Sequence, residues 1–504
     1  MPVAEAHVPA LTLEGRTGLY VDGHWVTPQE HKTFEVRDPS TGQSIATVVD
    51  AGPADALRAL DAAVAAQDMW SSTPPRDRAN ILRHAYDRLW DRRDEVAATI
   101  TREMGKSLTE AQAEVRYGAE FLRWFSEEAV RIGGRWGVLP EGTGSLHVAR
   151  KPVGPCYLVT PWNFPLAMAT RKIAPAVAAG CTVVLKPADL TPLTAMLLVD
   201  VLEEAGLPPG VVNLVTSTRP APISQTLLAD PRLRKLSFTG STTVGRLLLA
   251  QAAQRVLRCS MELGGNAPFI VLEGADVDAA VEGALAAKFR NVGQACTAAN
   301  RFLVHDSLAD KFAGRLAART RALKLGPGLA KDTDLGPMIT QGAVDRSLRI
   351  IDDAVQRGAA LLTGGSQLER PGHFLEPTVL MDVSRDSLAM TEEIFAPIAP
   401  IARFDTRQDA LETANVTDYG LAAYVFAPTL EAGQAVAAEL EAGMVGINMG
   451  VISNAAAPFG GVKSSGLGRE GGIEGIDEYL SIQYRAAPAR ALRTTTAGRQ
   501  QCAL

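Results

Sequence analysis

The stretch that decides the fold is residues 182–215, which read TVVLKPADLTPLTAMLLVDVLEEAGLPPGVVNLV. A short apolar run at 182–185 is followed by a segment with helical spacing at 193–205, which Gly206 closes, and by a second apolar run at 211–215. Strand, helix and strand in this order are typical of a parallel sheet covered by helices on both faces. The sequence therefore predicts an α/β fold, in which ligands bind beyond the carboxyl ends of the strands.

The same alternation extends on both sides of this stretch. Further strands are predicted at 156–159 and 236–238, and a second series begins with a strand at 269–272 and an amphipathic helix at 276–289. The helix-rich segment 54–132 predicts two long helices that end at Gly133-Gly134, whereas residues 486–504 lack an apolar period and are predicted to be irregular. With 504 residues, the chain should form two or three domains.

Composition narrows the class of protein. Hydrophobic residues make up 46% and charged residues 21%, which is typical of a globular protein, and the net charge of -6 gives no basic surface for nucleic acid. The five cysteines include no C-x-x-C pair and no metal-like spacing, which favours a reducing compartment over a disulfide framework and predicts no metal site. No uncharged apolar run is long enough to span a bilayer, so we expect a cytoplasmic protein that acts on a small molecule.

Cys296 is the candidate nucleophile. It lies in a polar, glycine-containing turn close to Arg290 and Asn291, and such surroundings stabilise a thiolate. Cys156, Cys181 and Cys259 lie in strand-like runs and Cys502 in the polar tail, so we interpret these four as structural or incidental. Glu262 precedes a Gly-Gly pair that predicts a tight turn at the end of a strand, which makes it a candidate base rather than a solvated glutamate.

Several ordered segments resemble the aldehyde dehydrogenase superfamily. They are Thr160-Pro161-Trp162-Asn163-Phe164-Pro165, Lys186-Pro187-Ala188, Phe238-Thr239-Gly240-Ser241, Glu262-Leu263-Gly264-Gly265-Asn266, Gly293-Gln294-Ala295-Cys296, Glu393-Ile394-Phe395 and Pro458-Phe459-Gly460-Gly461. The resemblance covers about residues 17–485. It implies catalytic roles for Cys296 as nucleophile, Asn163 as the amide that stabilises the oxyanion, and Glu262 as the base that activates water. Without the resemblance, Asn163 could equally cap a turn.

The resemblance also implies a nicotinamide cofactor. Its candidate contacts comprise the adenosine ribose residues Lys186 and Asp189, the pyrophosphate segment with Gly240, Ser241 and Gly245, the nicotinamide ribose residues Glu393 and Phe395, and the neighbouring Trp162 and Leu263. The glycine spacing is not the usual G-x-G-x-x-G, and a G-S-T run also begins ordinary helices. Asp189 would repel a 2′-phosphate and favours NAD, whereas Lys186, and also Arg219 in the loop that follows 211–215, could accept NADP.

Within the family, four segments are most similar to the branch that oxidises succinate semialdehyde. They are Thr170-Arg171-Lys172 and the ranges 288–291, 448–454 and 465–471. This similarity implies that Arg171, Arg290 and Ser453 bind the distal carboxylate of the substrate, although an arginine on a helix is more often a solvated residue. The alternatives are another semialdehyde such as glutarate semialdehyde, a coenzyme-A-acylating enzyme, or an inactive member of the fold.

The resemblance implies the organisation of the chain as well. We expect a Rossmann-type cofactor domain (17–132 and 151–263, with part of 458–478), an α/β catalytic domain (264–457) and a small β oligomerisation element (133–150 and 479–491). The tails 1–16 and 492–504 should be loosely ordered. Strands of the third element imply a homodimer or homotetramer.

Overall fold

The deciding stretch folds as predicted in the computed structural model, which describes residues 16–26 and 32–488. It forms β8 (Val183–Lys186), α6 (Leu193–Glu204) and β9 (Val212–Leu214). These strands join β7 (Cys156–Val159), β10 (Lys235–Thr239) and β11 (Arg258–Glu262) in a parallel array, with β19 (Gly466–Leu467), β1 (Leu19–Val21) and β2 (His24–Val26) as antiparallel edges. The predicted α/β sheet is confirmed at its centre, and its edges are antiparallel.

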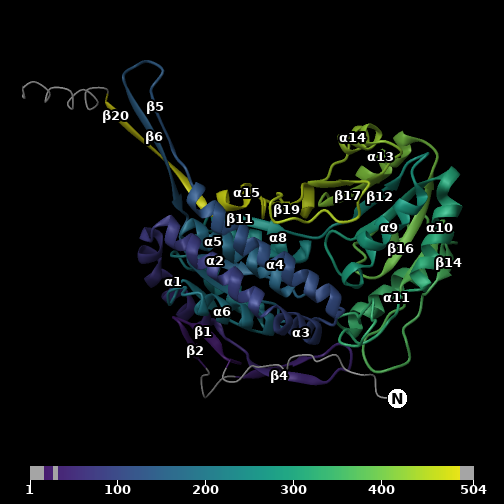
Figure 1. The fold of residues 1–504 in the computed structure, drawn as a ribbon, viewed down its shortest axis with the longest axis horizontal. Helices are drawn as coiled ribbons and strands as arrows, with labels where there is room; N and C mark the ends of the chain where they lie inside the picture. The colour runs from purple at the N-terminus through teal and green to yellow at the C-terminus, as the bar shows by residue number, and fades with distance from the viewer. Residues whose placement is uncertain (1–15, 27–31, 489–504) are drawn as a thin grey trace, which may run out of the picture.

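Helices cover both faces of this eight-stranded sheet (Figure 1). One core contains residues of β7 and β8 together with α2 (Pro75–Asp91), α4 (Leu108–Glu128), α5 (Pro165–Ala179) and α6. The opposite core contains α7 (Pro220–Ala229) and α8 (Thr242–Ala253), and α1 (Pro53–Ser72) contributes to both cores. Successive strand residues alternate between the two cores: Cys156 and Leu158 belong to the first, and Tyr157 to the second. Cys181 was predicted to lie in a strand, but it occupies the buried turn just before β8.

The prediction of two long helices in 54–132 is wrong. The segment forms α1 (Pro53–Ser72), α2 (Pro75–Asp91), α3 (Arg93–Met104), α4 (Leu108–Glu128) and a short 3-10 turn (Ala129–Arg131). Pro74 and Pro75 lack the N–H groups that would continue α1, and Gly105 ends α3 in the left-handed region at φ 93°. Ser107 then caps α4 by accepting a hydrogen bond from the Glu110 amide.

A second sheet of seven strands begins just beyond Glu262. Its order is β14 (Ala360–Thr363), β15 (Thr378–Met381), β16 (Ile398–Phe404), β13 (Ala299–His305), β12 (Ala267–Val271), β17 (Ala422–Phe426) and β18 (Met444–Ile447). All neighbours are parallel except β14. The helices α9 (Val277–Lys288) and α10 (Asp306–Arg321) cover one face, and α11 (Gln341–Gln356), α12 (Leu388–Thr391), α13 (Arg407–Asn415) and α14 (Leu430–Ala437) cover the other.

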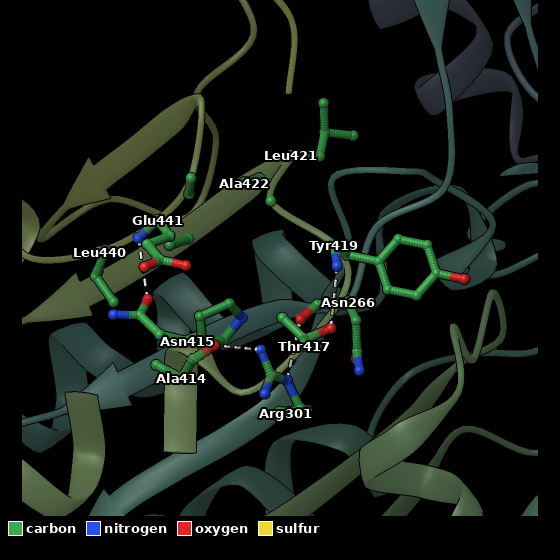
Figure 2. A pocket seen from close by; sticks show the side chains of 14 residues that line it. Asn266, Arg301, Ala414, Asn415, Thr417, Tyr419, Leu421, Ala422, Leu440 and Glu441 are labelled. Atoms are coloured by element: carbon green, nitrogen blue, oxygen red, sulfur yellow. Dashed lines mark hydrogen bonds between the residues drawn. The ribbon is translucent and has the colours of Figure 1, made fainter. Parts of the chain in front are cut away.

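Arg301 fastens the start of this second sheet (Figure 2). Its buried guanidinium donates to the carbonyl of Asn266 at 3.0 Å and to the carbonyls of Thr413 and Ala414 at 2.8 Å each, near the end of α13. A cation is favourable at a helix C-terminus, where carbonyls lack partners. Burial lowers the pKa of Arg301 to about 10. The contact fixes the segment that leads from Glu262 to β12.

The third sheet is an arm that projects from the body (Figure 1). It consists of β5 (Arg135–Val138), β6 (Gly144–Pro152) and β20 (Leu480–Pro488), all antiparallel. Residues 486–488 were predicted to be irregular, but they pair with β6, and this pairing does not require an apolar period. A separate hairpin joins β3 (Thr33–Arg37) and β4 (Ser44–Val49). The predicted tails lie largely outside the described residues.

The three sheets come from different parts of the chain, and the predicted division into domains stays a prediction. The eight-stranded sheet is built from residues 19–262 plus β19, the seven-stranded sheet lies within 267–447, and the arm comes from β5, β6 and β20. The assignment of cofactor binding, catalysis and subunit contact to these parts stays a prediction. Among the described residues, no helix is both long and apolar enough to cross a membrane.

Candidate active site

The thiol of Cys296 lies on a loop whose backbone is unusual. After α9, a short 3-10 turn (Arg290–Gly293) brings three consecutive residues into the left-handed region: Asn291 at φ 56°, Val292 at φ 58° and Gly293 at φ 71°. Such φ values are strained for asparagine and still more for a β-branched residue, and strain of this kind clusters at functional sites. A Cβ on Gly293 would lie 2.3 Å from the carbonyl oxygen of Ala396. The loop is therefore locked against the segment that carries Glu393 and Phe395.

Hydrogen bonds of both its side chain and its backbone carbonyl hold Asn163 beside this loop. Its side-chain Nδ2 donates to the carbonyl of Gln294 at 3.0 Å, two residues before the thiol. The backbone carbonyl of Asn163 accepts hydrogen bonds from the Lys106 ammonium at 2.8 Å and from the side-chain Nδ2 of Asn291 at 3.0 Å. The amide is thus oriented toward the loop before any ligand enters, as an oxyanion donor requires.

Glu262 ends β11 as a buried carboxyl. Only 2% of the residue is exposed, and neither of its carboxyl oxygens has a hydrogen-bond partner among the described residues. Burial, followed by the neighbouring Glu470, raises the pKa of Glu262 well above its usual range. Burial also raises the pKa of the Cys296 thiol to about 12, while Arg171 acts in the opposite direction. A carboxyl with a raised pKa is a suitable general base near neutral pH.

One cavity of about 280 Å³ joins these groups to most of the predicted cofactor residues. Its lining includes Cys296, Glu262 and Asn163 together with Trp162, Gly240, Ser241, Leu263, Glu393 and Phe395. The rings of Trp162 and Phe395 meet edge to face at 5.6 Å. Glu393 accepts from the Gly265 amide at 2.9 Å, and burial raises its pKa to about 7.

The remaining cofactor candidates lie around this cavity. Ser241 caps α8 by accepting from the Val244 amide at 3.3 Å, and Gly245 packs so closely against Leu263 that a Cβ would lie 2.4 Å from that side chain. Lys186 donates to the Pro187 carbonyl at 2.9 Å, and burial lowers its pKa to about 8 despite Asp189 and Asp50. Arg219 is largely exposed and lies 3.8 Å from Asp50. Buried acceptors, a capped helix start and a close glycine approach together fit a dinucleotide.

The predicted carboxylate ligands approach the thiol from another side. Arg171 is fully buried, pairs with Glu470 and stacks 4.0 Å over the ring of Phe459. Arg290 is half-buried with its guanidinium 5.4 Å from the ring of Phe164, and within the described part of the chain it forms no ion pair. Ser453 lines a separate cavity of about 420 Å³.

Comparison with known proteins identifies the family. The profile of the aldehyde dehydrogenase family matches residues 25–484. A succinate-semialdehyde dehydrogenase from Paenarthrobacter nicotinovorans is 57% identical over 440 residues, covering 87% of this chain and 98% of that protein. A glutarate-semialdehyde dehydrogenase from Pseudomonas aeruginosa is 46% identical over 469 residues, covering 93% of this chain and 97% of that protein. The crystal structure of an NADP-dependent enzyme from E. coli superposes with a TM-score of 0.92 at 44% identity and covers 94% of this chain and 98% of that chain.

The chain belongs to the aldehyde dehydrogenase family. The predicted resemblance to aldehyde dehydrogenases and the predicted α/β fold class are therefore confirmed. Enzymes of this family use NAD or NADP. The structure places most of the predicted residues of this aldehyde dehydrogenase at the thiol loop or along the cofactor cavity. Lys186 ends β8 and Asp189 lies in the turn that follows, Gly245 packs against Leu263, and Ser453 lines the second cavity. Their individual roles stay predictions.

Several neighbours of the site were missed from the sequence. Lys106, which is paired with Glu114, donates a hydrogen bond to the Asn163 carbonyl, and Glu470 forms an ion pair with Arg171. Tyr117 faces Ser453. Arg346 lines the cofactor cavity and donates to the Glu393 carbonyl at 2.6 Å. Only Glu470 lies within a segment quoted for the resemblance, 465–471, and that segment gives it no separate role. A single polar residue inside a helical run has no local signal that separates it from a solvated one.

Proposed function

We propose that this aldehyde dehydrogenase oxidises a short aldehyde that carries a distal carboxylate, with succinate semialdehyde as the first candidate and glutarate semialdehyde as the second. The observation that carries the proposal is Arg290. It is a half-buried guanidinium that forms no ion pair within 4 Å in the described chain, and it is close enough to the buried Glu110 carboxyl and to the Cys296 thiol to influence the pKa of both. A guanidinium in this position would bind a substrate carboxylate and disfavour a neutral aldehyde of the same length. The relatives named for succinate and glutarate semialdehydes support this choice.

The reaction assigned to the site begins with Cys296. Its thiol gives its proton to solvent water and the resulting thiolate adds to the carbonyl carbon, and the Asn163 amide and the Cys296 backbone N–H stabilise the oxygen that becomes negative. NAD or NADP, when bound, supplies the hydride acceptor. Once hydride has left the adduct, a thioester remains on Cys296. Glu262 then takes a proton from water, whose oxygen replaces the sulfur and releases the carboxylic acid.

For the cofactor we propose NAD. Asp189 can accept both hydroxyls of the adenosine ribose and would repel a 2′-phosphate. Lys186 and Arg219 are the residues that would permit NADP, which the E. coli enzyme with a similar structure uses according to its description. The ratio of kcat/KM with the two cofactors decides between them, and a ratio in favour of NADP would reverse this part of the proposal.

The arm is proposed to join subunits in a dimer or tetramer. Trp136 and Val138 of β5 and Ile482 and Tyr484 of β20 expose more than half of their area, which is unusual for a cluster of large apolar side chains. Ile482→Glu should therefore lower the mass measured by light scattering. An unchanged mass would place the subunit contact elsewhere.

The experiment that tests the main proposal measures kcat/KM for succinate, glutarate, malonate and aromatic semialdehydes and for butanal, each with NAD and NADP. Succinate semialdehyde should be preferred over butanal by at least about tenfold, the value of one weak charged contact. A rate that requires coenzyme A would favour the acylating alternative, and no turnover with any aldehyde would favour an inactive protein.

A further inference from the structure

Two buried hydrogen-bonding groups lie at the second cavity or beside it. The Tyr117 hydroxyl, which lines the cavity, and the neighbouring Nη1 of Arg171 are both shielded from solvent, and neither has a hydrogen-bond partner of ordinary length and angle among the described residues. The hydroxyl faces the Arg171 guanidinium and the Ser453 side chain. Because buried polar groups in native proteins are almost always paired, two adjacent exceptions require an explanation.

Tyr117 is partly buried as a residue but has a shielded hydroxyl, and it differs from two deeply buried tyrosines whose hydroxyls are paired. The hydroxyl of Tyr157 pairs with Ser224 at 3.1 Å, and that of Tyr424 donates to the Thr297 carbonyl at 2.7 Å. Removing a hydroxyl from water without giving it a new hydrogen bond costs about 1–3 kcal/mol. The packing of the Tyr117 ring does not need the hydroxyl, so packing does not explain this cost. The Tyr117 hydroxyl is therefore positioned for a partner that enters from outside the chain.

The ring is fixed in the orientation that such a role needs. Tyr117 lies on α4 one turn before Phe121, and the two rings meet edge to face at 4.9 Å. Together with Ser453, Tyr117 lines the cavity of about 420 Å³, while Arg171 on the adjacent α5 contacts Met168, which lines the cofactor cavity. Arg171 thus lies between the cavity that contains the thiol and the cavity that contains Tyr117.

We propose that Tyr117 determines specificity by donating a hydrogen bond from its hydroxyl to the distal carboxylate of the substrate, next to Arg171 and Ser453. The inference rests on the proposed function. Burial raises the pKa of Tyr117, so the hydroxyl stays protonated and remains a donor. A substrate that ends in a methyl group leaves this donor unpaired, and sites built to bind a polar group discriminate strongly against analogues that lack it.

The rim of this cavity does not offer a competing cation. Arg123 is ion-paired with Glu120 at 2.6 Å, and Glu127 adds a further negative charge. The donors available to a carboxylate are therefore Tyr117 and the three groups close enough to influence its pKa, Arg171, Arg290 and Ser453. This arrangement sets the distance between the carboxylate and the aldehyde, and with it the preferred length of the substrate.

Tyr117→Phe tests the inference because it removes only the hydroxyl and keeps the ring contact with Phe121. KM for succinate semialdehyde should rise about ten- to a hundredfold, as expected for one hydrogen bond to a charged group, with kcat within about twofold. KM for butanal should not change, and its turnover also reports that the variant is folded. Inhibition by succinate should weaken by the same factor as KM for the semialdehyde rises. Tyr157→Phe is the matched control, since it removes a buried hydroxyl remote from the thiol.

Two results would overturn the inference while leaving the proposed function intact. One is an unchanged KM for succinate semialdehyde in Tyr117→Phe, when the unmodified enzyme prefers this substrate over butanal. The other is an equal loss with both aldehydes, which would assign Tyr117 a structural role. If the unmodified enzyme shows no preference between the aldehydes, the proposed function itself fails.

Discussion

The side chains of Lys106 and Glu114 form a completely buried ion pair, with the ammonium 2.6 Å from the carboxylate. Lys106 uses a second hydrogen bond, of 2.8 Å, to hold the carbonyl of Asn163. The other carboxylate oxygen of Glu114 accepts from the amides of Leu166 and Ala167 in the first turn of α5, at 2.9 and 3.3 Å. One ion pair thus fixes both the loop that carries Asn163 and the helix that follows it.

Replacing Lys106 by methionine should lower both stability and kcat. The change leaves the Glu114 carboxylate buried without its counter-ion, which typically costs about 3–5 kcal/mol, and it releases the Asn163 carbonyl. Unfolding in urea and steady-state kinetics measure the two effects. In the double variant Lys106→Met/Glu114→Gln, stability should partly recover because no unpaired Glu114 carboxylate is buried. The value of kcat should stay low, because the hydrogen bond from Lys106 to the Asn163 carbonyl is still missing.

The exposed Lys311 on α10 provides the control, since Lys311→Met should alter neither quantity. A folded Lys106→Met enzyme with the kcat of the unmodified protein would show that Lys106 does not position Asn163.

The pKa of Cys296 predicts how its reactivity depends on pH. Burial raises this pKa to about 12, so only a small fraction of the thiol is ionised at neutral pH in the cofactor-free protein. Alkylation by iodoacetamide, followed on the Cys296 peptide by mass spectrometry, should accelerate about tenfold per pH unit between pH 7 and 9. A rate that levels off near pH 8 would mean that the thiolate is already stabilised in the free enzyme. Cys296→Ala corrects for labelling of the other cysteines and should itself oxidise no aldehyde.

Local patterns predicted the strands and the thiol loop well, for a physical reason. A buried parallel strand needs a continuous apolar run, and a sharp turn needs glycine or proline. The strands β7, β8 and β10 can therefore be predicted from the sequence. The breaks at Pro74-Pro75 and Gly105 carried equally clear signals, which the uniformly helical composition around them obscured.

Contacts between distant segments explain what could not be predicted. Residues 486–488 are in a strand only because β6, more than 300 residues earlier, pairs with them. Lys106 meets Asn163 across 57 positions, and Lys172 meets Glu470 across 298. Ordinary helical and loop residues acquire these roles through packing, which leaves no trace in the neighbouring sequence.

Glu262→Gln should separate the two halves of the reaction. Neither carboxyl oxygen is hydrogen-bonded in the described chain, so the amide breaks no hydrogen bond there but removes the base that activates water. Loss of a general base typically costs about a hundred- to ten-thousandfold in rate. Rapid mixing should reveal a burst of reduced cofactor equal to the enzyme concentration, followed by slow turnover, with an acylated Cys296 detectable by mass spectrometry. A slow time course without a burst would mean that Glu262 acts before the thioester forms.

Arg290→Ala tests the carboxylate contact that supports the proposed substrate. KM for succinate semialdehyde should rise by about ten- to a hundredfold or more, because the variant loses a guanidinium that lies near the thiol and forms no ion pair within 4 Å in the described chain, whereas KM for butanal should barely change. Arg315→Ala on the surface of α10 is a suitable control, since its ion pair with Asp278 is exposed. An equal loss with both aldehydes would show that Arg290 supports the loop rather than the substrate.

Gly293→Ala should abolish most activity by a steric route. The glycine has φ 71°, and an added Cβ would lie 2.3 Å from the carbonyl oxygen and 2.5 Å from the carbonyl carbon of Ala396, so one of the two loops must move. Gly142→Ala is the matched control: its φ of 70° imposes the same backbone cost of about 1 kcal/mol, but nothing lies within 4 Å of the new methyl group. The control should therefore lose a little stability and keep its kcat. Gly293→Ala should instead lose kcat, because displacement shifts Cys296 relative to Glu393 and Phe395, and an error of about 1 Å in a reacting geometry can cost a hundredfold in rate. A kcat within about twofold of the unmodified enzyme would mean that the two loops can separate without affecting the chemistry.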